Sequence, residues 1–479
     1  MSMRNGWHGG LLLAVAALLV SGLGAQASDA LSLTLADAIE LALEQNRTLA
    51  GAEASEEAAR ARLAQANAAF LPKITGSASY TRLDEVPYMD ASGFGDKFAP
   101  LAAPFDSLVQ DGYLNPAALE GLSGGTGSDR ITMGDDDIYS IALQVQQPLF
   151  TGGALLNARS AASHGLRAAE ANTRRTGDET RYAVTEAYVG AVQARAALAV
   201  TGDAVEQMGA HLSDLEAMYA EGMLIESDIM RARVQMSEVE LQHNAAEHLV
   251  QLAEASLAFQ IGLDPGTRIE AVDPLTSGGV PERSLDDWTE RALAARPDLL
   301  GVSEGVKAAG NAVAIARAEY LPQLVFVGSY GWDRPDRSYD PEFYEHWSAT
   351  LALEMNIFDW FGRENRVREA GAVRREAEHG LAMMKDAVVL DVKRCYLELD
   401  EAARAVEIAE RGVVQARESM RVTRESFRSG VASNSDVLDA QTALTGSEMN
   451  RVAALARLRL AEAGLDLATG VASDREEIR

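Results

Sequence analysis

The amino-acid sequence predicts a mostly α-helical fold with transmembrane β-strands, built as an internal duplication. Two long proline-free segments, 149–264 and 342–479, carry apolar residues at three- and four-residue spacing, which is the pattern of amphipathic helices. Four shorter segments alternate apolar and polar side chains, as strands with one apolar face do. The two halves of the chain also match each other, and a match with so long a period indicates the duplication of a whole folding unit.

The duplication is visible without gaps at two offsets. A shift of 208 residues aligns the proline-free segments and places Tyr188 on Tyr396. A shift of 250 residues aligns the segments before them and places Leu71-Pro72 on Leu321-Pro322. Each half is therefore expected to follow one plan: helix, strand, loop, strand and long helical hairpin.

Residues 1–27 are predicted to be an export signal peptide. Arg4 precedes an apolar core at 11–20, and Ala25-Gln26-Ala27 supplies small residues for cleavage. That core is too short to cross a bilayer, and no other apolar run reaches the length of a membrane helix. The single cysteine, Cys395, excludes a disulfide framework and a lipid-modified mature N-terminus. A mature protein that enters a membrane must then do so with strands.

The first repeat, 28–262, contains all five predicted kinds of element. They are a helix at 34–70, a strand at 72–83, an extracellular loop at 84–137, a strand at 138–149 and a helical hairpin at 153–262. Thr34 is the expected N-cap of the first helix. The loop is rich in proline, glycine and acidic residues, and a long loop of this kind fits the cell exterior.

The second repeat, 285–470, follows an equatorial connector at 263–284 that carries several prolines and glycines. Its predicted elements are a helix at 285–320, a strand at 322–332, a loop at 333–346, a strand at 347–357 and a helical hairpin at 362–470. A C-terminal tail is expected at 471–479.

Each helical hairpin is predicted to turn once, at Gly222 and at Gly430, because glycine can adopt the left-handed conformation that ends a helix. Ser227 and Ser435 are the expected N-caps of the returning helices. At 1.5 Å per residue, the outgoing arm of the first hairpin would be roughly 100 Å long and its return arm roughly 55 Å. No compact globular domain needs an arm of that length.

The predicted strands are each about ten residues long, which is enough to cross an outer-membrane bilayer when tilted. Aromatic residues bracket them in the pattern of two interfacial girdles. These expected membrane-interface aromatics are Phe70, Phe150, Tyr320, Phe358 and Trp360 at the helix ends, and Tyr80, Tyr330, Trp332 and Trp347 at the loop ends. A soluble antiparallel sheet with one buried face is the alternative. Because four strands cannot close a barrel and open edges are not tolerated in lipid, several chains must share one wall.

Composition and motifs argue against other functional classes. A net charge of -28 argues against nucleic acid as a partner, because phosphate binding needs a basic face. We expect no enzyme, cofactor or metal site. The only histidine cluster, His243 and His248, is spaced five apart, which turns the two side chains about 140° away from each other on a helix. Nucleophile elbows and phosphate loops are absent from the sequence. Cys395 lies mid-helix and is expected to pack in a core.

These features resemble those of the TolC family of outer membrane efflux proteins. The resemblance covers essentially the whole mature sequence, from the duplicated plan and the Leu-Pro strand starts to the glycine turns followed by Ser-Asp and the segment Asp436-Val-Leu-Asp439-Ala-Gln. It implies a homotrimer in the outer membrane of a Gram-negative bacterium. Four strands per chain would form a twelve-stranded β-barrel in outer membrane lipid, continued by a long periplasmic α-helical barrel.

The resemblance also implies a function. The protein would be the passive exit duct of a tripartite efflux system, receiving small molecules from an inner-membrane pump of the RND, MFS or ABC type through a periplasmic membrane fusion (adaptor) protein. The same architecture serves type I protein secretion, which is the first alternative. A periplasmic coiled-coil scaffold or adhesin stalk is an alternative of a different class.

The matching positions give the expected sites. The adaptor would dock at the hairpin tips, at Gly222, Met223, Leu224, Ile225, Gly430, Val431, Ala432 and Ser433. Asp228, Asp436 and Asp439 match the aspartates that ring the closed periplasmic entrance in this family. The helix dipole alone also favours an acid in a first turn, and this explains Asp439 less well than Asp228. In the best-known member of this family, an Arg and a Tyr near the tip lock the entrance, and the matching positions here are Ala432 and Phe427, which cannot make the same bonds.

The oligomeric state tests the transmembrane strands. Because no single chain can close a wall in lipid, the purified mature protein is expected to be an oligomer that requires detergent. Size-exclusion chromatography with light scattering measures its mass. A detergent-free monomer in water would contradict the prediction.

Overall fold

The computed structural model describes residues 31–86, 88–90, 108, 110–111, 130–132, 135–276, 283–335 and 342–470. The signal peptide 1–27, the tail 471–479 and parts of the loops 84–137 and 333–346 and of the connector 263–284 lie outside the described residues. The chain divides into two compact units. The helical unit comprises 1–59, 166–305 and 377–479, and the strand unit comprises 60–165 and 306–376.

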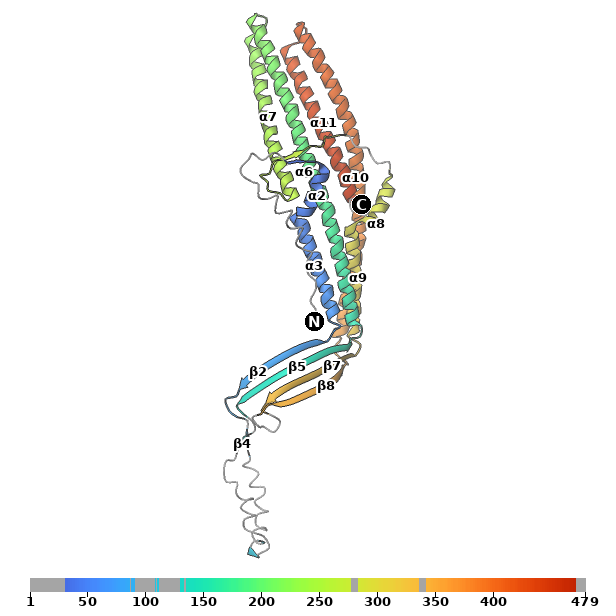
Figure 1. Ribbon diagram of the computed structural model, residues 1–479. Coiled ribbons are helices and arrows are strands. Elements are labelled where there is room, and N and C mark those ends of the chain that lie inside the picture. The colour runs from blue at the N-terminus through green and yellow to red at the C-terminus, as the bar shows by residue number, and fades with distance from the viewer. Residues whose placement is uncertain are drawn as a thin grey trace, which may run out of the picture. The chain divides into compact units, whose positions relative to one another are not determined.

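Corresponding arms of the two long hairpins have the same length. The helices are α2 (Leu35–Gln45), α3 (Arg47–Ala68), α6 (Ala154–Ala220), α7 (Glu226–Ile261), α8 (Leu285–Ala295), α9 (Pro297–Ala318), α10 (Gly362–Arg428) and α11 (Asn434–Thr469), as Figure 1 shows. Helices α6 and α10 have 67 residues each, and α7 and α11 have 36 each. The equal lengths follow from the duplication. None of the helices in the described ranges has a sufficiently apolar stretch to cross a bilayer.

The predicted continuous helices at 34–70 and 285–320 are wrong, because each is interrupted by one residue in an extended conformation. Asn46 separates α2 from α3 with φ -70° and ψ 123°. Its side-chain oxygen accepts the N–H of Thr48 at 2.8 Å and so caps the new helix. Arg296 separates α8 from α9 with φ -61° and ψ 122°. Proline at 297 causes this break, since it excludes the residue before it from the helical region.

The two break residues bind equivalent carbonyl groups in the two repeats. Asn46 Nδ2 donates to the carbonyl of Gln260, near the end of α7, at 3.0 Å. Arg296 Nη1 donates to the carbonyl of Ala468, near the end of α11, at 3.2 Å. The breaks are related by the offset of 250 and the carbonyls by the offset of 208, so the duplication is preserved at the level of single hydrogen bonds.

The returning helices end close against the breaks. Gly262 follows α7 with φ 95°, and Gly470 follows α11 with φ 70°. A Cβ atom at Gly262 would lie 2.7 Å from the carbonyl oxygen of Gln45, so the left-handed turn and the lack of space both require glycine there. Each break therefore receives the C-terminus of a returning helix.

The helices that precede the breaks begin with matching caps. Thr34 and Asp37 form a capping box at α2, which confirms the predicted N-cap, and Ser284 and Asp287 form the equivalent box at α8. Two apolar clusters lie beside these helices. One includes Ala38 and Tyr188, and the other includes Trp288 and Cys395, which is buried as expected. A short parallel pair, β1 (Leu31–Leu33) and β6 (Ile269–Ala271), borders the first cluster.

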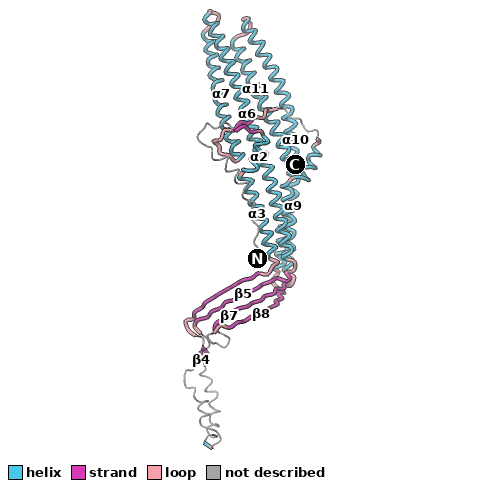
Figure 2. The backbone as a smooth tube through the Cα atoms, in the orientation of Figure 1, coloured by secondary structure: helices cyan, strands magenta, loops and turns pink. Residues whose placement is uncertain are grey.

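The strand unit is built on one antiparallel sheet. Strands β2 (Lys73–Arg82), β5 (Asp137–Phe150), β7 (Gln323–Arg334) and β8 (Tyr344–Glu354) lie in the order β2-β5-β7-β8, drawn in magenta in Figure 2. A further short pair is formed by β3 (Tyr88–Asp90) and β4 (Arg130–Thr132). β8 begins and ends earlier than the predicted 347–357, because its pairing with β7 starts at Tyr344 opposite Asp333.

Strand register gathers most of the large apolar side chains of the sheet on one face, although Val325 and Val327 of β7 lie on the other. Val145 lies opposite both Ile74 and Gly328, and Gly328 lies opposite Ala349. The neighbouring row is polar and contains Thr75, Gln144, Ser329 and Ser348. The apolar row on β8 is uncovered, with Leu351 62% and Leu353 68% exposed. The sheet therefore combines one apolar exposed face with two outer strands, β2 and β8, that pair on one side only within the described chain.

Removing the Arg296 side chain is expected to destabilise the helical unit. Arg296 is buried, and it pairs with Asp298 at 2.7 Å and Asp391 at 2.9 Å. Burial opposes the charge of Asp298, but the hydrogen bonds and the charge of Arg296 outweigh it and lower the pKa of that carboxyl. Arg296→Ala would leave the partly buried carboxylate of Asp298 without its ion-pair partner, whereas Asp391 would keep Arg394 at 2.8 Å, and we expect a cost of about 3 kcal/mol.

Asn46→Ala is the matched control, because it removes only neutral hydrogen bonds at the equivalent position, the bond to Gln260 and the cap on Thr48, and should cost about 2 kcal/mol. Thermal unfolding in detergent, followed by circular dichroism, measures both. The ion pairs would be unimportant if the two variants lost the same stability. The Asp298 contribution is present above the ordinary pKa of 3.8 and is lost as the pH falls through the lowered pKa.

Candidate functional site

The predicted docking and entrance residues lie at the ends of the two long hairpins. These ends lie at the same end of the helical unit in Figure 1. They pack on each other through one apolar cluster with members from α6, α7, α10 and α11, namely Met208, Leu215, Ala232, Met420, Phe427, Val437 and Leu444. The four helices therefore form a single packed tip.

Both tip turns depend on a glycine in the left-handed conformation. Gly222 has φ 75° and Gly430 has φ 76°. The N–H of Met223 donates to the carbonyl of Met218 at 3.0 Å, and the N–H of Val431 repeats this bond in the second turn at 2.9 Å. A Cβ atom at either glycine would meet no other atom within 4 Å. Backbone conformation, and not lack of space, therefore selects glycine at both tips.

The tip turns present apolar side chains to solvent. Met223 is 62% exposed, Ile225 66% and Val431 83%. Leu224 and Ala432 turn inward and pack against the shared cluster. Exposed apolar side chains on a rigid turn are typical of protein-docking surfaces.

The predicted N-caps Ser227 and Ser435 are wrong, because the returning helices begin earlier. The N-cap of α7 is Ile225, which makes no side-chain capping bond. The N-cap of α11 is Ser433, whose hydroxyl accepts the N–H of Asp436 at 3.3 Å. In return, Asp436 Oδ2 accepts the N–H of Ser433 at 2.7 Å. The Ser433 hydroxyl and backbone bonds lower the pKa of Asp436, so this carboxylate has a structural role.

The other two predicted entrance aspartates differ in their surroundings. Asp228 is half-buried, and its main-chain carbonyl accepts the amide of Asn434 at 3.0 Å. Asp439 is exposed, and within the described part of the chain its carboxylate forms no hydrogen bond or ion pair. It lines a shallow groove of about 420 Å³ together with Met230, Arg231, Val234, Gln235, Ser435 and Leu438. Of the three, Asp439 is the carboxylate most available to a solute.

Sequence reasoning missed a buried polar pair at the tip. His211 of α6 is 7% exposed, and its Nε2 lies 2.9 Å from Oδ1 of Asn434 in α11. The ring of Phe427 stands edge-on to the imidazole at 5.6 Å. His211 lies three residues after Met208 and four before Leu215, on the buried stripe of α6, and this position was the one available signal.

The predicted membrane-interface aromatics all lie in the strand unit. Phe70 is half-buried, and the other eight are exposed: Tyr80, Phe150, Tyr320, Tyr330, Trp332, Trp347, Phe358 and Trp360. Trp360 and Phe361 both have left-handed backbones, with φ 57° and 67°. That conformation is strained for bulky residues. The equivalent positions in the first repeat are glycines 152 and 153, at φ 62° and 88°.

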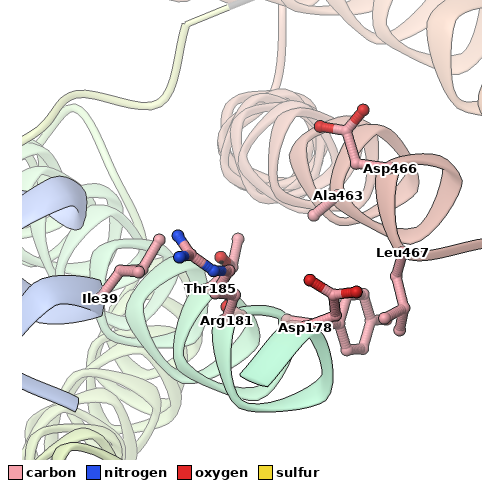
Figure 3. Close-up of a pocket in the computed structure, with 8 residues that line it drawn as sticks. Ile39, Asp178, Arg181, Thr185, Ala463, Asp466 and Leu467 are labelled. Atoms are coloured by element: carbon pink, nitrogen blue, oxygen red, sulfur yellow. Dashed lines mark hydrogen bonds between the residues drawn. The ribbon is translucent and has the colours of Figure 1, made fainter. Parts of the chain in front are cut away.

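A small cavity elsewhere in the helical unit does not resemble a ligand site. Figure 3 shows its lining, which includes Asp178, Arg181 and Thr185 of α6 and Asp466 of α11. Its volume of about 150 Å³ is below the range usual for small-molecule pockets. Among the described residues, no group of three or more His, Cys, Asp or Glu side chains is placed to hold a metal ion.

Comparison with known proteins assigns the chain to a family. Residues 38–92, 121–263 and 288–471 match the family model described as outer membrane efflux protein. The chain is similar to protein CyaE of Bordetella pertussis, with 28% identity over 368 residues, covering 73% of this chain and 75% of CyaE. It is also similar to the alkaline protease secretion protein AprF of Pseudomonas aeruginosa, with 26% identity over 350 residues, covering 69% of this chain and 71% of AprF.

The fold matches that of a solved outer membrane channel. The crystal structure of the Campylobacter jejuni CmeC outer membrane channel superposes with a TM-score of 0.74 at 17% identity, covering 92% of this chain and 88% of CmeC. The mostly helical fold is thus that of TolC-like channels. Because the family model spans most of the sequence, the resemblance is confirmed, and the chain belongs to the outer membrane efflux protein family.

Proposed function

We propose that this protein is the exit duct of a tripartite efflux system in the outer membrane of a Gram-negative bacterium. The four-stranded sheet, with one apolar exposed face and two outer strands, carries the proposal. In an outer membrane efflux protein, such a face suits contact with outer membrane lipid. The sheet would be one part of a wall that several chains complete.

The edges of the sheet favour a closed oligomer. Each unpaired backbone group in lipid costs several kcal/mol, so β2 of one chain would pair with β8 of the next. Two chains would give eight strands, whose interior side chains fill the barrel. Three chains would give twelve strands and leave room for a lumen. A homotrimer with a twelve-stranded barrel is therefore the assembly we propose, with the helices extending into the periplasm as a second barrel.

Partners follow from the exposed tips. The apolar side chains of Met223, Ile225 and Val431 offer a docking surface for a membrane fusion (adaptor) protein. That adaptor would connect the duct to an inner-membrane pump of the RND, MFS or ABC type. The duct itself would carry out no chemical reaction and would pass small molecules with energy supplied by the pump.

Entrance and membrane contacts complete the proposal. Three copies of Asp439, together with Asp228 and Asp436, would place negative charge around the periplasmic entrance and favour cations there. The nine aromatics would position the strand unit at the two lipid interfaces.

Type I protein secretion is the second candidate, because the relative AprF is named as an alkaline protease secretion protein. Deletion of the gene separates the two candidates. Loss of resistance to drugs, dyes or metals supports small-molecule efflux, whereas retained resistance with loss of one exported polypeptide supports secretion. The scaffold or stalk alternative is disfavoured by the family match.

Replacing Asp439 with lysine is expected to change conduction. In planar bilayers the purified protein should give salt-dependent single-channel currents, and D439K should weaken both cation preference and block by multivalent cations. D439N is the matched control, because it removes the charge without reversing it and should give an intermediate effect. Identical single-channel records for all three proteins would exclude Asp439 from the conducting path.

A further inference from the structure

His211 is a buried titratable side chain to which the proposed function assigns no role. It projects from α6 into the apolar cluster of the tip, between Met208 and Leu215. Histidine changes its charge close to physiological pH, so a buried copy at a packed joint makes that joint sensitive to protons.

The contacts of His211 connect all four tip helices. The Asn434 amide nitrogen donates to the carbonyl of Asp228 in α7 at 3.0 Å. Asn434 Oδ1 must therefore be the acceptor in the 2.9 Å bond with His211, and Nε2 of the imidazole carries the hydrogen. One polar chain thus runs from α6 through α11 to α7, and Phe427 adds α10 by its edge contact.

The charges around His211 disfavour a second proton. Burial is the largest influence and lowers the pKa of His211, and Arg424 of α10 lowers it further. The Asn434 hydrogen bond and Asp214 of α6 act in the opposite direction but are outweighed. Asp214 is itself 3.8 Å from Arg428 of α10. Helices α11 and α7 contribute the neutral Asn434 amide and the Asp228 carbonyl.

We propose that His211 and Asn434 form a proton-responsive clasp, which keeps the two hairpin ends packed while the imidazole is neutral and releases them when it is protonated. The consequence for transport, a looser periplasmic entrance at acidic pH, rests on the proposed function. The separation of the hairpin ends does not depend on conduction. The clasp also supplies a polar contact across the tip, where Phe427 and Ala432 cannot form a polar side-chain lock.

The direction of the pH effect follows from linkage. A base with a lowered pKa in the packed tip binds its proton more tightly once the tip opens and water reaches it. The stabilisation of the packed tip by the clasp is therefore complete above the ordinary pKa of 6.5, and it is lost as the pH falls below that value. A single proton can shift the opening equilibrium by at most about tenfold per pH unit.

Hydrogen–deuterium exchange on the full-length protein in detergent tests the clasp. Between pH values of about 7.5 and 5.5, and after correction for intrinsic rates, amides at 208–218 and 434–444 should lose protection by up to about tenfold per pH unit below 6.5. His211→Gln should abolish the loss, because glutamine keeps an N–H donor for Asn434 but does not titrate in this range.

Two controls accompany the test. His248→Gln removes an exposed histidine of α7 and should leave the response intact. Amides at 184–192, which lie in the apolar cluster beside α2, should keep their protection in all variants. An equal loss of protection in H211Q, or no loss in the unmodified protein, would overturn the clasp.

A second measurement tests the clasp even if the H211Q variant does not fold, because it uses the unmodified protein. NMR titration of the His211 imidazole in the unmodified protein should give a pKa below the ordinary 6.5, and a value at or above 6.5 would overturn the proposal. Bilayer recordings separate this from the proposed function. Conduction without pH-dependent exchange would support the proposed duct and contradict the clasp. Exchange that depends on pH, in a protein that does not conduct, would support the clasp and contradict the proposed duct.

Discussion

The structure of the helical unit depends on which donors form hydrogen bonds with the last backbone carbonyl groups of its helices, at the places where two helix C-termini meet. The last carbonyl groups of α2 and α7 approach each other, as do those of α8 and α11, and such ends carry partial negative charge. Each repeat places a donor between them: the neutral amide of Asn46 in the first and the guanidinium of Arg296 in the second. The cation suits the carbonyl ends better, but its own burial then requires Asp298 and Asp391 as partners. The meeting point of two helix C-termini is therefore stabilised by a neutral amide in the first repeat and by a buried ion-pair network in the second.

The strand unit shows the same divergence between repeats. At the junction from strand to long helix, the backbone takes two successive left-handed residues in both halves. Glycines 152 and 153 accept that conformation without strain, and a Cβ at position 152 would lie 2.6 Å from the carbonyl of Ala318. In the second repeat, Trp360 and Phe361 adopt it, with Trp360 83% exposed. Bulky apolar side chains at a strained position are consistent with our proposal that this segment contacts a lipid interface.

At the tip, the duplication is broken where function is expected. The two glycine turns are nearly identical, yet only the second returning helix has a side-chain N-cap, and only α6 carries a buried histidine in the shared cluster. Asp436 serves the cap of α11, whereas Asp439 one turn later has a carboxylate free of partners within the described chain. The apolar turns, the capped helix start and the polar pair thus occupy different positions of one small region.

The sequence alone determined the features that depend on residues close together in the chain or on direct self-comparison. Periodicity gave the long helices and the alternating strands, glycine gave the turns at Gly222 and Gly430, and self-comparison gave the duplication, because each of these is encoded within a few residues or by direct matching. The break at Arg296 was also readable from the proline that follows it, whereas the break at Asn46 is marked only by the weaker signal of asparagine as a favoured N-cap residue. Only the tertiary structure decided the order and register in which the strands pair, that the N-cap of α11 is Ser433 and not Ser435, and that His211 meets Asn434 across 223 residues. Those features arise from pairing between distant segments, and pairing geometry is set by packing in three dimensions rather than by local preference.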